Sequence, residues 1–267
     1  MGIYAIVSGG FHLAKASTKV IALAGKGGVG KTTLSAAFVR ILIEERPGAR
    51  ILAIDADPAV GLATALGIQV ASTVDDIRNS VIEIAQSGAA HKAVELLGEA
   101  RYRMLDTLVE EAGFSFLAIG RPETAGCYCQ VNAYLKEVIR MISASFDYVV
   151  IDGEAGIEQI NRRVMENVTH LVLVTDASRK GTQVAATICR VAQPLVNYER
   201  CGAIVNRLPD AVPADSVSVD GVDILCCIGN DGVHAVNEVR GESIFSRPAD
   251  ALVLRGARQA LHGLGLL

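Results

Sequence analysis

Short runs of apolar, often β-branched residues alternate along this chain with longer stretches whose apolar positions recur at helical spacing. The short runs predict strands and the longer stretches predict helices, because side chains repeat every two residues in a strand and about every 3.6 in a helix. Strands separated by helices are typical of a parallel sheet, so we expect an α/β fold in which a mainly parallel, twisted sheet carries helices on both faces. The expected strands are 19–24, 50–54, 114–119, 147–151, 170–175, 202–206 and 223–228. The expected helices are one following Lys31, two at 74–85 and 92–111, three beginning near Asn132, Gln159 and Lys180, and two more at 233–240 and 249–262.

The composition indicates a large aliphatic core. Hydrophobic residues make up 51% of the 267 residues, aromatic residues only 4%, and tryptophan is absent, so Ala, Val, Ile and Leu must fill the interior. A chain of this length is near the upper limit for one core. We therefore expect a single domain over 19–267, preceded by an extension, 1–18, that the strand and helix pattern does not explain.

Charge and the length of apolar runs argue against two classes of partner. The net charge is −4 and the isoelectric point about 5.8, which disfavours non-specific binding to nucleic acid or to anionic lipid. No apolar run approaches the roughly 18 residues of a membrane-spanning helix, and segment 1–20 lacks the basic start of a signal peptide. We expect a cytoplasmic protein that binds neither nucleic acid nor membrane.

A glycine-rich segment connects the first expected strand to an alanine-rich helix. Segment 25–33, GKGGVGKTT, fits the P-loop pattern GxxxxGK(S/T). The glycines let successive backbone N–H groups face inward, and the helix N-terminus adds partial positive charge, so such a loop cradles phosphates. Lys31 would reach the β- and γ-phosphates, and the Thr32 hydroxyl would hold Mg²⁺. The nucleotide-binding residues expected here are Gly25, Lys26, Gly27, Gly28, Val29, Gly30, Lys31, Thr32 and Thr33.

The same glycines also fit the weaker dinucleotide pattern GxGxxG, at Gly25, Gly27 and Gly30. A dinucleotide loop needs no cation after its last glycine, whereas Lys31 and Thr32 stand there. We therefore expect ATP or ADP with Mg²⁺ as the ligand. A glycine-rich turn that binds nothing is the remaining alternative.

Lys26 is a second lysine within the loop, and it cannot easily reach phosphates that Lys31 already contacts. In this feature the segment resembles the deviant Walker A family of SIMIBI-type P-loop NTPases, which includes MinD, ParA, ArsA-like ATPases and the nitrogenase iron protein. The resemblance implies that Lys26 crosses a homodimer interface to the partner's nucleotide, where it stabilises charge much as an arginine finger does. It also implies ATP hydrolysis that depends on dimer closure.

Aspartates follow two of the expected strands, where side chains face the ligand crevice of an open α/β sheet. Asp152 closes the apolar run 147–151 in the Walker B manner and is expected to bind Mg²⁺ through water. Asp55 and Asp57 follow 50–54, and Asp55 is expected to help hold hydrated Mg²⁺. The resemblance implies that Asp57 positions or activates the attacking water, in a catalytic group with Lys26, Lys31 and Asp152. The alternative is that Asp55 and Asp57 only cap the following turn.

Asn206 ends the expected strand 202–206. The family resemblance implies that its side chain hydrogen-bonds the adenine base. The alternative is an ordinary loop asparagine.

Two cysteines separated by one residue, Cys127 and Cys129, stand in the segment after 114–119. In a reducing compartment such a pair suggests metal or redox chemistry before a structural disulfide. One chain supplies two thiolates, whereas a soft ion such as Zn²⁺ commonly takes four ligands. A two-fold dimer with this loop on its axis would complete a four-thiolate site. The alternatives are a pair of small core hydrophobes and a redox switch. The remaining cysteines, expected in the core, are Cys189, Cys201, Cys226 and Cys227.

The segments RPETAGCYC at 121–129 and DGEAGIE at 152–158 narrow the resemblance to the CooC-type ATPases. That family matures carbon monoxide dehydrogenase by helping to insert nickel. The resemblance, which covers about 20–267, implies Ni²⁺ or Zn²⁺ at Cys127 and Cys129. It also implies a client metalloenzyme such as carbon monoxide dehydrogenase.

Two other functions remain open. In an iron–sulfur reductase like the nitrogenase iron protein, the first cluster cysteine matches Cys127, but the place of the second holds Gln159. A 4Fe–4S cluster here would therefore need the Cys-x-Cys loops of two chains. A positioning switch of the MinD or ParA kind is the other alternative. MinD-like proteins carry a basic amphipathic C-terminal helix, whereas segment 260–267, ALHGLGLL, contains two glycines and no basic face.

Overall fold

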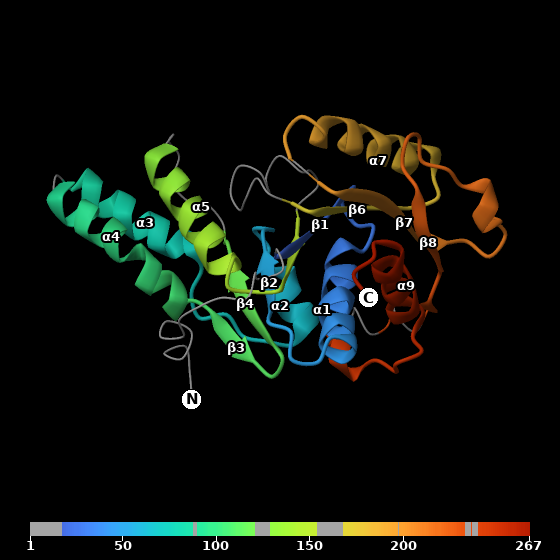
Figure 1. Cartoon of the computed structure of the whole chain (residues 1–267), viewed down its shortest axis with the longest axis horizontal. Helices are drawn as coiled ribbons and strands as arrows, with labels where there is room; N and C mark the ends of the chain where they lie inside the picture. The colour runs from blue at the N-terminus through green and yellow to red at the C-terminus, as the bar shows by residue number, and fades with distance from the viewer. Residues whose placement is uncertain are drawn as a thin grey trace.

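The computed structural model describes residues 18–87, 90–120, 129–153, 168–196, 198–232, 236 and 240–267. An eight-stranded sheet runs through these residues in the order β3-β4-β2-β5-β1-β6-β7-β8, with every neighbouring pair parallel except β3 and β4 (Figure 1). The predicted fold class is therefore confirmed. The strands are β1 Lys19–Gly25, β2 Ile51–Asp55, β3 Val109–Glu111, β4 Phe114–Ala118, β5 Tyr148–Asp152, β6 His170–Thr175, β7 Arg200–Leu208 and β8 Ile224–Gly229.

Helices cover both faces of this sheet (Figure 1). Helices α1, α2 and α9 pack on one face, and α5 and α7 pack on the other. Helices α3, α4 and α5 contact one another and form a helical group at the β4 side of the molecule. The helices are α1 Lys31–Glu45, α2 Gly61–Leu66, α3 Val74–Gln86, α4 Ala90–Asp106, α5 Cys129–Ser143, α7 Arg179–Ala192 and α9 Leu252–Gly263, with short 3₁₀ turns η2 Ala214–Ser216 and η3 Ile244–Ser246.

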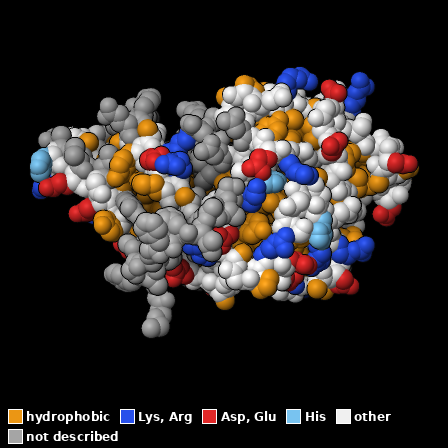
Figure 2. Space-filling model, in the orientation of Figure 1, with side chains coloured by type: hydrophobic (Ala, Val, Ile, Leu, Met, Phe, Trp, Pro, Cys, Tyr) orange, Lys and Arg blue, Asp and Glu red, His pale blue; other side chains and the backbone are white. Residues whose placement is uncertain are grey.

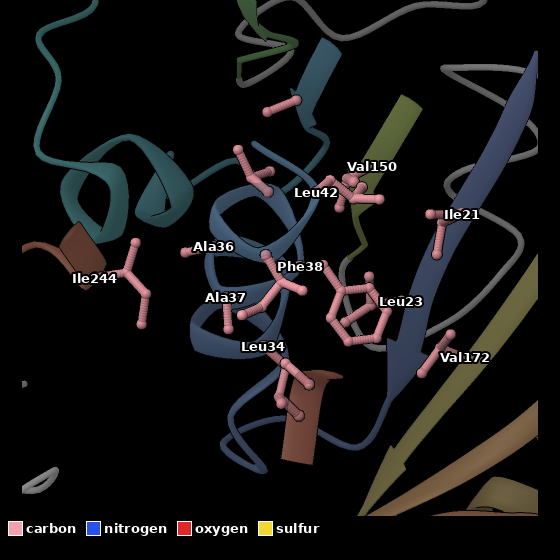
Figure 3. Packing of buried hydrophobic residues seen from close by; sticks show 14 of the residues in the cluster. Ile21, Leu23, Leu34, Ala36, Ala37, Phe38, Leu42, Val150, Val172 and Ile244 are labelled. Atoms are coloured by element: carbon pink, nitrogen blue, oxygen red, sulfur yellow. The ribbon is translucent and has the colours of Figure 1, made fainter. Parts of the chain in front are cut away.

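Strand β1 shows why the central strands are apolar throughout. Ile21 and Leu23 belong to the core on the α1 side, and Ala22 and Ala24 belong to the core on the α7 side. Successive side chains of a strand point to opposite faces, so a strand covered on both faces needs apolar residues at every position. Figure 3 shows the α1 side of this core, where the labelled side chains of α1 (Leu34, Ala36, Ala37, Phe38 and Leu42) lie beside Ile21, Leu23, Val150, Val172 and Ile244.

The outer surface has no strongly charged face in the view of Figure 2, where acidic and basic side chains are interspersed among the described residues. No helix in the described ranges is long and apolar enough to cross a membrane.

One expected helix is wrong in its last turn. The predicted helix 92–111 ends at Asp106, and Val109–Glu111 forms the edge strand β3, which pairs antiparallel with β4. Gly113 makes this hairpin turn with a φ of 99°, a conformation that glycine adopts at low cost. The short helix α2 was not expected, and β7 is longer at both ends than the predicted 202–206.

Several expectations fall on parts of the chain that the structure does not describe. The helix expected near Gln159 lies outside the described residues, and so does most of 233–240. Of the expected extension 1–18, only Thr18 is described, and its hydroxyl donates to the Phe146 carbonyl at 2.9 Å.

Candidate nucleotide site

The phosphate loop lies between β1 and α1, at the carboxyl edge of the sheet. Gly25 has a φ of 149°, and a Cβ there would stand 2.1 Å from the Val174 carbonyl oxygen. Gly30 has a φ of 94°, and its Cβ would stand 2.5 Å from the side-chain nitrogen of Asn206. Around Gly27 and Gly28, by contrast, the space is open. The loop therefore packs tightly where it meets the sheet and leaves room for a phosphate at its tip.

The two loop lysines point in different directions. Lys31 is buried, and its ammonium donates to the backbone carbonyl of Lys26 at 3.3 Å, within the loop. The Lys26 ammonium lies 3.5 Å from a carboxylate oxygen of Asp176, just beyond the end of β6. Lys31 is thus placed at the phosphate loop, whereas Lys26 forms an ion pair beside it, within its own chain.

Asp176 is held by neighbours on both sides. Burial raises the pKa of Asp176, but hydrogen bonds from Ser178 and the nearby Lys26 outweigh that effect and hold the pKa below its ordinary value. The Ser178 amide donates to Asp176 at 3.0 Å, and the Ser178 hydroxyl donates to the same oxygen. Asp176 therefore stays charged and faces Lys26 at the start of α7.

Asp55 and Asp152 lie directly opposite each other on the adjacent strands β2 and β5, and both are fully buried. The Asp55 carboxylate accepts hydrogen bonds from the amides of Asp57 at 3.0 Å and Leu62 at 2.8 Å. One Asp152 oxygen accepts from the Ser35 hydroxyl at 2.9 Å. The other, Oδ2, is buried without a hydrogen-bond partner among the described residues.

This arrangement perturbs both carboxyl groups. Burial, followed by the charge of Asp152, raises the pKa of Asp55 to about 7. Burial raises the pKa of Asp152 to about 6, although hydrogen bonds from Thr32 and Ser35 and the charge of Lys31 oppose the shift. Two buried carboxylates, one with an unsatisfied oxygen, beside a threonine hydroxyl are an oxygen-only donor set of the kind that Mg²⁺ prefers. The residues present therefore fit a magnesium ion.

Asp57 is half-buried, and one of its carboxylate oxygens accepts from the Ala59 amide at 2.9 Å. This contact caps the turn after β2, which was the alternative role considered for Asp57 from the sequence. The carboxylate is also close enough for its charge to raise the pKa of both Asp55 and Asp152. Asp57 thus lies at the magnesium-type site and caps its own turn.

The end of β7 holds the phosphate loop from the other side. Asn206 is buried, and its amide nitrogen donates to the Val29 carbonyl at 2.8 Å. The Arg207 guanidinium donates to the Gly28 carbonyl at 3.0 Å, and Arg207 has a φ of 55°. A non-glycine residue in this left-handed region carries a cost that often marks a functional site.

Three residues of this site were missed from the sequence: Ser35, Asp176 and Arg207. Ser35 stands one helical turn after Lys31, on the first turns of the P-loop helix, so its position was the available signal. Asp176 directly follows β6 and Arg207 stands near the end of β7. Only the sheet order shows that β6 lies next to the P-loop strand β1, and that β7 lies next to β6.

The predicted metal ligands are described only in part. Cys127 lies outside the described residues, and Cys129 is the first residue of α5, with its side chain undescribed. The described ranges contain no group of three or more His, Cys, Asp or Glu side chains that could hold a metal ion. Since β4 ends at Ala118 and α5 begins at Cys129, the loop between them starts at the same sheet edge as the phosphate loop.

Comparisons with known proteins show the family to which the chain belongs. A family model described as an AAA domain matches residues 18–198. An uncharacterised ATP-binding protein of Methanocaldococcus jannaschii is 35% identical over 190 residues, covering 71% of this chain and 74% of that protein. The carbon monoxide dehydrogenase accessory protein CooC of Rhodospirillum rubrum is 31% identical over 222 residues, covering 73% of this chain and 84% of that protein.

A solved structure is also similar in fold. The septum site-determining protein MinD of Pyrococcus horikoshii, in complex with Mg-ADP, has a TM-score of 0.66 at 19% sequence identity. The match covers 92% of this chain and 96% of that one.

Proposed function

We propose that this chain, which belongs to the AAA domain family and is a P-loop ATPase of the MinD/ParA class, delivers a soft metal ion to a client enzyme. In this proposal the chain acts as a homodimer, the ion is nickel, and the client is an enzyme such as carbon monoxide dehydrogenase. The likeness to CooC, an accessory protein of that enzyme, supports the client. The RPETAGCYC segment at 121–129 supports the metal.

The observation that carries the proposal is a hydrogen-bonded connection from the magnesium-type site toward the cysteine loop. The Ile119 amide donates to the Asp55 carbonyl at 2.9 Å, and the Ile119 carbonyl accepts from the Asp75 amide at 2.9 Å. Ile119 directly follows β4, at the start of the segment that leads to Cys127 and to Cys129, the first residue of α5. In our proposal, a shift of Asp55 when the nucleotide changes state reaches the segment that leads to these cysteines through the bond to the Ile119 amide.

ATP hydrolysis rests on the residues at the sheet edge. Mg²⁺ would be held by the Thr32 hydroxyl and by Asp55 and Asp152, and when bound it would neutralise charge on the phosphates. Lys31 binds the β- and γ-phosphates, for which its buried position in the loop prepares it. Asp57 accepts a hydrogen bond from the attacking water and orients it.

The base and the second subunit complete the nucleotide site. Asn206 takes part in adenine recognition, from a position fixed by its bond to the Val29 carbonyl. On dimer closure Lys26 leaves Asp176 and reaches the partner's phosphates, where its charge stabilises the developing charge. Hydrolysis then requires two chains.

The metal is cargo and not a resident cofactor. Cys127 and Cys129 of two chains supply four thiolates to one ion, Ni²⁺ in this proposal or Zn²⁺. Since both the shared thiolates and Lys26 act only in the dimer, hydrolysis and metal release are coupled through the same interface.

A positioning switch of the MinD kind is the second candidate. The similarity to the MinD fold over 92% of this chain favours it. A switch of that kind uses the nucleotide-dependent dimer but has no use for Cys127 and Cys129. The two candidates therefore differ in what loss of these cysteines does.

The test is activation of metal-free carbon monoxide dehydrogenase by the nickel-loaded protein, with ATP and with a non-hydrolysable analogue. We expect activation to need ATP hydrolysis and to be lost in the Cys127→Ser/Cys129→Ser variant, while Cys227→Ser, a change on β8, serves as the matched control and stays active. Activation that survives the double change, or that equals free nickel alone, would refute delivery and favour the positioning switch.

A further inference from the structure

A pair of thiols lies in contact on the α7 face of the sheet. Cys189, on the last turns of α7, and Cys201, at the start of β7, place their sulfur atoms 3.7 Å apart. The hydroxyl of Tyr198, in the connection between these two elements, lies 3.7 Å from the Cys189 sulfur. Both cysteines are only partly buried, so a small molecule can reach them.

We propose that Cys189 and Cys201 form a reversible oxidation site that a peroxide converts to an intramolecular disulfide. The sulfurs must approach by about 1.7 Å to reach a disulfide bond length of about 2.05 Å. Cys189 lies one turn before the end of α7, where a helix frays most readily, so α7 can supply this movement. The two residues are 12 positions apart, so the bond closes a short loop containing Tyr198.

The surroundings assign different roles to the two sulfurs. Burial raises the pKa of Cys201 above its ordinary value, so this thiol stays protonated and reacts second. Burial and the contact with Cys189 raise the pKa of Tyr198 to about 12, which keeps its hydroxyl protonated and able to donate to the Cys189 sulfur. The Tyr198 hydroxyl lies 3.7 Å from the Cys189 sulfur, where it can donate to that sulfur as it attacks the peroxide. Cys189 therefore attacks first.

The reaction balances with hydrogen peroxide as the oxidant. The Cys189 thiolate attacks one peroxide oxygen, the O–O bond breaks, and hydroxide leaves to take a proton, so Cys189 becomes a sulfenic acid. The Cys201 sulfur then attacks the Cys189 sulfur, the S–O bond breaks, and water leaves with the proton from Cys201. The two thiols lose two electrons, and one peroxide becomes two waters.

The experiment starts from the Cys127→Ser/Cys129→Ser protein, so that the cysteine loop cannot contribute. This protein is treated with hydrogen peroxide and followed by intact mass and by peptide mapping. We expect loss of two hydrogen atoms, a cross-linked peptide joining Cys189 to Cys201, a higher thermal unfolding midpoint, and full reversal by dithiothreitol.

Four single changes in the same background test the assigned roles. Cys189→Ser should abolish the cross-link, and Cys201→Ser should leave a sulfenic acid on Cys189 that dimedone traps. Tyr198→Phe should slow the reaction several-fold while leaving the reduced protein folded. Cys227→Ser, which changes a free cysteine of β8, should change nothing. An unchanged mass after oxidation, or a cross-link that joins other cysteines, would overturn the proposal.

Discussion

Replacing Asp176 with asparagine should strengthen ATP-dependent dimerisation. If Lys26 must leave Asp176 to reach the partner's nucleotide, the free energy of this ion pair opposes closure. The ammonium and carboxylate lie 3.5 Å apart with 40% and 33% of their side chains exposed, so the pair falls in the range of about 0.2–1 kcal/mol for surface ion pairs. A dimer breaks two such pairs, so the variant should dimerise about 2- to 30-fold more tightly.

Asparagine is the suitable replacement because it keeps the acceptor oxygen that holds Ser178, the N-cap residue of α7. The Ser178 amide can still donate to that oxygen, so the start of the helix remains intact. A matched control is Glu199→Gln, which removes the surface pair that Glu199 makes with Lys19 at 3.0 Å, at the other end of the β-strands.

The assay is sedimentation velocity with Mg²⁺ and a non-hydrolysable ATP analogue, at low and high salt. The gain in the Asp176→Asn variant should shrink as salt rises, since salt screens an exposed pair, and Glu199→Gln should dimerise as the unchanged protein does. A dimerisation constant that is unchanged or weaker in Asp176→Asn would show that Lys26 does not have to leave this partner.

Three further predictions concern the nucleotide site. Lys31→Ala should lose nucleotide binding and turnover together. Lys26→Ala should still bind nucleotide, as measured by calorimetry, but lose turnover and dimerisation. Equal loss of binding in both variants would place Lys26 in the nucleotide site of its own subunit. Asp57→Asn should bind Mg·ATP, accumulate as a dimer and hydrolyse ATP at least 100-fold more slowly, as expected when a group that orients the water is lost; near-normal phosphate release would leave Asp57 as a turn cap. For the nucleotide-free protein, the free energy of unfolding should fall as pH rises from about 4 to 7. In the folded state the pKa of Asp55 is about 7 and that of Asp152 about 6, against 3.8 for an unfolded aspartate. The folded protein therefore binds more protons than the unfolded chain over this range, and loses that stabilisation as pH rises. Denaturant titrations across this range check it, and stability that rises with pH there would contradict the raised values.

The parts of the fold that could be predicted are those in which local sequence decides the structure. The central strands are continuous apolar runs, and the phosphate loop is specified by its own glycines, lysine and threonine. Strand β3 could not be predicted, because Val109–Glu111 continues a helical pattern and becomes a strand only by pairing with β4. Burial and pairing by a distant partner outweighed local preference there.

The contacts around the phosphate loop could not be predicted for a related reason. Lys26 and Asp176 are 150 positions apart, and Asn206 and Val29 are 177 apart, so only the strand order brings them together. The type of residue after each strand was a signal that the site lies at this edge. Which of these residues contact each other depends on which strands are neighbours in the sheet.

The measurement that tests the central claim most directly is the number of metal ions bound per chain. Reduced protein is titrated with Ni²⁺ and with Zn²⁺ in the absence of oxygen, with and without a non-hydrolysable ATP analogue, while sedimentation follows the dimer. Our account predicts one ion per two chains and tighter dimerisation when metal is bound. It also predicts that the analogue changes the affinity for metal, and that metal changes the affinity for the analogue by the same factor. One ion per chain, or binding that persists in Cys127→Ser/Cys129→Ser, would contradict the shared site.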